Sequence, residues 1–222
     1  MSIIICLGCV GYLAAQISAG TVLISNLVDV PPIVAGLLIF GLLTIYTAIS
    51  GEVGGLLSQA FQGAIMVIAG VVLIIAFFVV TGGFGNVLEA VGSVSEITGA
   101  NGVTKTLGPD FLNAWGTMPG GISLTWMLIP LLGCVGQPQV IVRMYAVKNP
   151  RDLPKTGLVT GITHAIVSFL CVVIAYGALY LVSTGQIDPL PSGDNAIYAF
   201  ADHCGLWAQL LAYAAILAAV LS

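Results

Sequence analysis

The chain has 222 residues, of which 59% are hydrophobic and 6% are charged, with a formal net charge of -4 at pH 7. A soluble domain carries about 25% charged residues, so the composition excludes a soluble globular protein and predicts an integral membrane protein. Nucleic-acid binding is excluded as well, because the five Lys and Arg residues form no basic patch of the kind that it requires.

Apolar segments follow one another along the chain at about residues 3–24, 33–49, 54–80, 123–147, 156–182 and 206–222. A membrane-spanning helix needs roughly 20 apolar residues, and none of these segments has the alternating period of a barrel strand. We therefore expect an all-α protein with about six transmembrane helices, in a single membrane domain over residues 1–222. Short interfacial helices are predicted in the polar loops, at residues 86–91, 110–115 and 194–203.

Two polar residues of the first segment, Tyr12 and Gln16, lie four positions apart and share one face of a helix. Either they make a hydrogen bond that holds membrane helices together, or they contact a substrate. The third segment carries Ser58, Gln59 and Gln62 in its first turns, and its second half is purely apolar.

The fourth segment is interrupted at Gly136, Gln137 and Pro138. Proline removes a backbone donor and clashes with the preceding helical turn. Freed backbone groups in lipid cost several kcal/mol unless they are buried in protein or line a wet cavity. A broken membrane helix is therefore either a packing kink or a binding site, and the Gln137 amide could contact a substrate there.

Orientation follows from the basic residues, four of which lie in one stretch, at Arg143, Lys148, Arg151 and Lys155. Short cytoplasmic loops carry an excess of Lys and Arg, so the loop at 148–155 and, by counting spans, the N-terminus are predicted to be cytoplasmic. The last segment is still apolar at Ser222, which would leave a terminal carboxylate near hydrocarbon. We interpret the chain as a piece of a longer protein.

Several stretches together resemble the sodium:solute symporter family, and in particular its proline/pantothenate-permease-like branch. They are GQPQVIVRMYAVKNPRDL (136–153), YLAAQISAGTVL (12–23) with IYTAISGEVGGLLSQAFQ (45–62), and AAILAAVLS (214–222). The resemblance covers essentially the whole chain. It implies a LeuT-like bundle of inverted repeats, of which this chain would hold core helices three to eight.

The resemblance also implies a function. A multi-pass transporter in the cell membrane (inner or plasma) would use sodium to drive symport of a small organic solute by alternating access. Sodium would bind the carbonyl of Ala219 and the hydroxyl of Ser222, and the solute would bind between Tyr12, Gln16 and the break at 136–138. The expected partners are the solute, sodium and the lipid bilayer, with no cofactor and no metal beyond sodium.

Some alternatives stay open. Many relatives carry Thr-Asp where this chain has Ser58 and Gln59, and the lost charge favours one coupling ion while leaving proton coupling possible. A symporter-like sensor domain or a non-transporting membrane subunit is the rival function. An enzyme is not expected, because the spans hold no Ser/His/Asp, metal or paired-carboxylate constellation.

Overall fold

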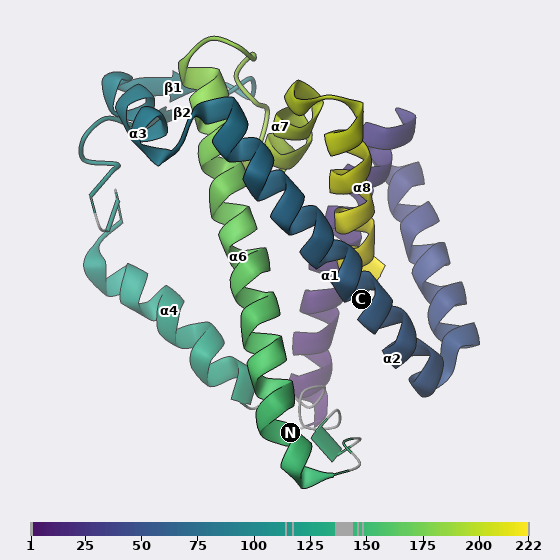
Figure 1. Cartoon of the computed structure of the whole chain (residues 1–222). Helices are drawn as coiled ribbons and strands as arrows, with labels where there is room; N and C mark the ends of the chain where they lie inside the picture. The colour runs from purple at the N-terminus through teal and green to yellow at the C-terminus, as the bar shows by residue number, and fades with distance from the viewer. Residues whose placement is uncertain are drawn as a thin grey trace.

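The computed structural model describes residues 2–113, 115–116, 118–135, 144–145, 147 and 149–221 (Figure 1). Helices make up most of this part of the chain. They are α1 (Ser2–Val28), α2 (Pro32–Thr81), α3 (Phe84–Ser93), α4 (Gly120–Val135), α6 (Leu153–Ser183), α7 (Ala196–Cys204) and α8 (Leu206–Leu221), with 3-10 turns η1 (Pro150–Asp152) and η2 (Gly193–Asn195). Two short strands, β1 (Glu96–Thr98) and β2 (Thr104–Thr106), complete the elements.

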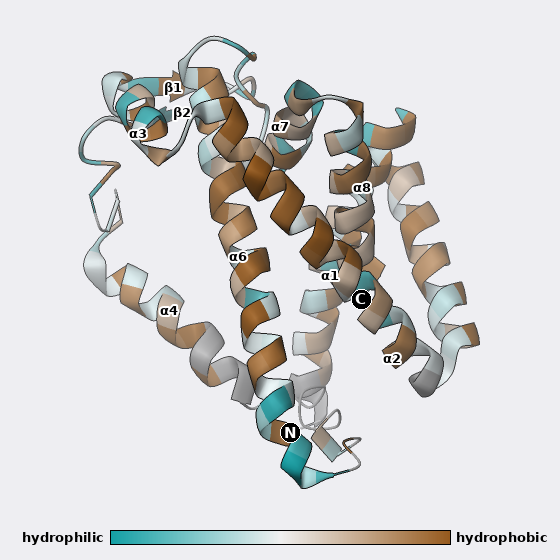
Figure 2. Ribbon diagram, viewed as in Figure 1, coloured by the Kyte–Doolittle hydropathy of each residue, from teal (hydrophilic) through white to brown (hydrophobic). Residues whose placement is uncertain are grey.

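Within the described residues, helical stretches long and apolar enough to cross a membrane are Cys6–Val28, Pro32–Gly51, Gly54–Thr81 and Pro150–Ser183. Shorter apolar helices cover Gly120–Ile129 and Leu206–Leu221. Figure 2 shows hydrophobic residues along the middle of the long helices and more hydrophilic ones toward the two ends of the bundle. The expectation of an all-α integral membrane protein is confirmed.

The long helix α2 consists of two helices joined at Gly51. The backbone there has φ 56° and ψ -170°, a region of conformational space that is open essentially to glycine alone. Figure 1 shows the chain reversing its direction at this point, so that the second half of α2 returns across the bundle. One glycine thus replaces a connecting loop between two membrane-crossing helices.

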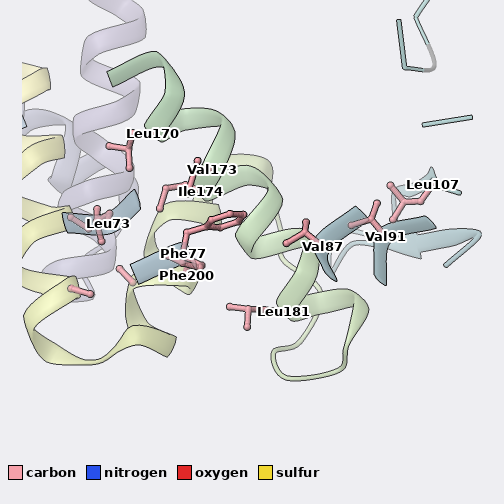
Figure 3. Packing of buried hydrophobic residues seen from close by; sticks show 13 residues of the cluster. Leu73, Phe77, Val87, Val91, Leu107, Leu170, Val173, Ile174, Leu181 and Phe200 are labelled. Atoms are coloured by element: carbon pink, nitrogen blue, oxygen red, sulfur yellow. The ribbon is translucent and has the colours of Figure 1, made fainter. Parts of the chain in front are cut away.

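The main hydrophobic core lies where α2, α3, α6, α7 and α8 meet (Figure 3). Phe77 of α2 and Phe200 of α7 are both fully buried. The ring of Phe77 also packs against Phe84 of α3, with 5.0 Å between ring centroids and 50° between the ring planes. A Cβ atom added to Gly177 of α6 would lie 2.7 Å from Phe200 Cε2. Glycine at this position therefore lets α6 approach the aromatic cluster closely.

The polar segments between the long helices form a cap at one end of the bundle (Figure 1). The short helices expected at residues 86–91 and 194–203 are confirmed as α3 and α7. The helix expected at 110–115 is wrong for its described residues, which form turns. Here Phe111 N donates to Gly108 O, Leu112 N to Pro109 O and Asn113 N to Asp110 O. Each bond joins residues three apart and closes a four-residue turn, in place of the four-residue spacing of an α-helix.

The cap also contains a β-hairpin that was not predicted. Strand β1 pairs antiparallel with β2, with Glu96 opposite Thr106 and Thr98 opposite Thr104. Beyond the hairpin, Ala100 N donates a hydrogen bond of 3.1 Å to Leu190 O in the segment between α6 and α7. The two polar segments are therefore joined to each other directly.

Candidate functional site

Tyr12 and Gln16 lie on α1, and the structure confirms that they face one another. Gln16 Nε2 donates a hydrogen bond of 2.9 Å to the Tyr12 hydroxyl. Tyr12 remains 61% exposed, so this bond leaves most of its ring surface open. The arrangement satisfies one amide proton of Gln16 and orients the phenol, while the other hydrogen-bonding capacity of the pair stays available to a ligand.

One turn further along the same face, α1 meets two other helices at Gly20. A Cβ atom on Gly20 would lie 2.5 Å from Ile39 Cγ1 of α2 and 3.1 Å from Val220 Cγ1 of α8. Small residues allow membrane helices to approach this closely. The structure therefore brings the α1 face that carries Tyr12 and Gln16 to the C-terminal end of α8, where the sodium ligands were predicted.

At that end of α8, a stripe of small residues runs along one helix face. Ala208, Ala212 and Ala215 are buried, whereas Ala219, which continues the stripe, is exposed. Ala218 and Val220, on either side of it in the sequence, are buried, so the exposure at this end of α8 is on the face of Ala219. Ser222, the other predicted sodium ligand, lies outside the described residues.

The predicted break at Gly136, Gln137 and Pro138 also lies outside the described residues. The structure describes the helix that precedes it, α4, which ends at Val135. Figure 1 shows α4 standing apart from the rest of the bundle, and Trp126 and Met127 on it are exposed. The role of the break remains a prediction.

Sequence reasoning gave no functional role to Gln62, on the second half of α2. Gln62 is only 9% exposed, and its Oε1 atom has no hydrogen-bond partner among the described residues. The other buried polar residue of the described chain, Thr81, donates to Phe77 O at 2.8 Å. The signal in the sequence was a glutamine more than one helical turn inside an apolar segment.

A cavity of about 300 Å³ lies in the cap, and the sequence did not indicate it. It is lined by the hairpin, the last turns of α6 and the segment before α7, through residues that include Ile97, Leu107, Ala178, Val182, Pro191 and Ala196. Lys105 and Asn101 add polar groups to this largely apolar lining.

The charged residues of the described chain lie at the ends of the bundle. Lys155 Nζ is 3.3 Å from Asp152 Oδ1, in an exposed ion pair at the start of α6. Among the residues that the structure describes, no three His, Cys, Asp or Glu side chains come together as a metal site would need. The oxygen atoms of helix ends, amides and hydroxyls are therefore the groups that could hold a cation within the bundle.

A comparison with protein-family models matches the sodium:solute symporter family over residues 1–222. The chain belongs to this family. Comparisons with curated proteins and with solved structures found no match. Membership shows a membrane protein of a family whose members carry solutes together with sodium, which agrees with the apolar helices.

Proposed function

We propose that this chain forms part of a secondary active transporter, in which the sodium gradient drives uptake of a small organic solute by alternating access. Membership of the sodium:solute symporter family over the whole chain is the observation that carries this proposal. The geometry supports it, because Gly20 joins the helix with the predicted solute residues to the helix end with the predicted sodium residues.

In this proposal, sodium binds the Ala219 carbonyl and the Ser222 hydroxyl, and the solute contacts Tyr12, Gln16 and the break at 136–138. A backbone carbonyl and a hydroxyl are neutral oxygen ligands, which can replace the water molecules around an alkali cation. A neutral phenol and amide on α1 can orient a polar solute without imposing a charge on it.

We also propose a LeuT-like arrangement in the cell membrane, with the loop at 148–155 and the N-terminus in the cytoplasm. The arrangement of the helices supports this orientation, because the N-terminus and η1 lie at the same end of the bundle in Figure 1 and the cap lies at the other. The N-terminus and the loop at 148–155, which are both predicted to be cytoplasmic, are thus at the same end of the molecule.

Uptake measurements with the protein expressed from its complete reading frame test the proposal. Proteoliposomes are given an inward gradient of sodium or of choline, and a panel of radiolabelled amino acids and small carboxylic acids is screened. We expect at least one solute to accumulate faster with sodium. Equal uptake of every solute under both gradients, in protein that is folded and correctly inserted, would contradict sodium coupling.

The rival function, a sensor or a non-transporting subunit, predicts a different result in the same vesicles. A sensor would bind its solute with a sodium-dependent affinity but would not carry it across the bilayer. Solute binding to detergent-solubilised protein, measured beside uptake, separates the two functions. Accumulation above the outside concentration favours the transporter.

A further inference from the structure

The buried amide of Gln62 is a polar group that the fold leaves unsatisfied. Its Oε1 atom can only accept a hydrogen bond or coordinate a cation, and it has no partner among the described residues. Leaving a buried acceptor unpaired costs about 1–3 kcal/mol. A hydroxyl such as that of Tyr46, which is also buried without a partner, can donate as well as accept, so Gln62 is the more restricted group.

The face of α2 that carries Gln62 is the face that packs inside the bundle. Ala69, Leu73 and Ala76 follow Gln62 on this face by helical spacing, and all are buried. Near Gly70, α2 contacts Ile166 and Leu170 of α6. Figure 1 shows α2 and α6 diverging from this crossing toward the lower end of the bundle.

Helix α8, in contrast, packs against α2 and runs antiparallel to its second half (Figure 1). Phe77 of α2 and Ala208 of α8 belong to the same core cluster. From Phe77 back to Gln62, and from Ala208 forward to the end of α8, each helix covers roughly 20 Å at 1.5 Å per residue. Counted along the two helices from their shared cluster, Gln62 and the C-terminal end of α8 therefore lie at similar distances toward the same end of the bundle.

We propose that Gln62 Oε1 is a ligand for the transported sodium ion, so that the cation site extends from the end of α8 to α2. This inference rests on the proposed sodium coupling. Amide and carbonyl oxygens can replace the water molecules around an alkali cation. The burial of Gln62 suits a bare ion better than an organic solute. A neutral ligand also binds weakly enough to release the ion, as transport requires.

Binding of radioactive sodium to the purified full-length protein tests this without knowledge of the solute. In Gln62→Leu the oxygen is lost, and we expect the Kd for sodium to rise about tenfold or more, as for loss of one bond to a charged group. Gln62→Glu restores an oxygen ligand with a negative charge, and its Kd should be at or below that of the wild type.

Gln209→Leu is the matched control, because its amide, on the first turns of α8, already donates to Asp202 Oδ1 at 2.7 Å. Its Kd for sodium should not change. A folded Gln62→Leu protein with the wild-type Kd would overturn the inference. If Gln62→Leu does not fold, a folded Gln62→Glu protein with weaker sodium binding than the wild type would overturn it instead.

The outcomes also separate this inference from the proposed function. In one outcome, the wild-type protein binds sodium and shows sodium-driven uptake, while Gln62→Leu binds sodium with unchanged affinity. This result supports symport and shows that Gln62 is not a sodium ligand. Wild-type protein that binds no sodium overturns both. A variant that changes only the KM for the solute would place Gln62 at the solute and would overturn the assignment to sodium.

Discussion

Gly177 of α6 lies directly against the ring of Phe200 of α7. A Cβ atom on Gly177 would stand 2.7 Å from Cε2 and 2.8 Å from Cδ2 of that ring. Both residues are buried, and Phe200 belongs to the core cluster that joins the cap to the long helices (Figure 3). Because Gly177 has no side chain, α7 in the cap can pack closely against α6.

We expect Gly177→Ala to destabilise the protein by about 1–3 kcal/mol, the usual cost of overpacking a core. A ring atom of Phe77 also lies 3.2 Å from the added atom, so the new methyl group meets fully buried aromatic rings from two helices. Thermal unfolding in detergent, followed by fluorescence-detected gel filtration, measures the loss. Gly161→Ala on the same helix is the control, because nothing lies within 4 Å of its Cβ position. A Gly177→Ala protein as stable as this control would contradict the packing argument.

Gly51→Ala should destabilise the junction between the two halves of α2. With φ at 56° and ψ at -170°, alanine would be strained at a cost of about 1–3 kcal/mol. No atom lies within 4 Å of the Cβ position, so the effect would come from the backbone alone. Gly63→Ala, in the regular part of α2 and equally unobstructed, should be neutral or stabilising. Equal melting temperatures for the two variants would show that the turn tolerates a side chain.

The tyrosine in the cap, Tyr198, should ionise at unusually high pH. Burial, together with the neighbouring Tyr213 and Asp194, raises the pKa of Tyr198 to about 12. An unperturbed tyrosine has a pKa of about 10, so the folded state holds this proton more tightly than the unfolded state does. The contribution of this proton to the stability of the folded state is fully present below pH 10 and is lost as the pH rises through about 12.

Ultraviolet titration of tyrosinate, compared between the wild type and Tyr198→Phe, checks this. The difference between the two proteins should be a single group that titrates near pH 12. A difference spectrum with a midpoint near pH 10 would mean that the ring is solvated.

Cysteine labelling tests the proposed orientation in the membrane. In a background without native cysteines, Lys105→Cys in β2 and Arg151→Cys in η1 place thiols at exposed positions on the two sides of the predicted bilayer. A membrane-impermeant maleimide should label the first variant in intact cells and the second only after permeabilisation. The reverse pattern would contradict the proposed topology.

The fold class could be predicted from hydropathy, because an apolar run such as residues 54–80 is long enough to span a membrane. Its length and composition indicate this whatever the run packs against. The hairpin at residues 96–106 could not. Its strands have three residues each, too few to show an alternating pattern, and its position depends on a partner near Leu190. Local polar composition likewise suggested a helix at 110–115, where Pro109 and Gly108 instead set turns.

The candidate site divides in the same way. Tyr12 and Gln16 are neighbours on one helix, so their spacing was enough to predict a shared face, although the hydrogen bond between them was not predicted. The contact of Gly20 with Ile39 and Val220 joins three helices, and no local pattern encodes it. Gln62 stood out by its polarity, but only the packing of α2 showed that its amide oxygen lacks a partner.

The hydrogen bond between Ala100 and Leu190 has a consequence for how the protein is made. Leu190 is synthesised after Ala100, and α4 and α6 lie between the two in the sequence. This hydrogen bond can therefore form only after both helices have been synthesised, so the two halves of the cap join late in the production of the protein.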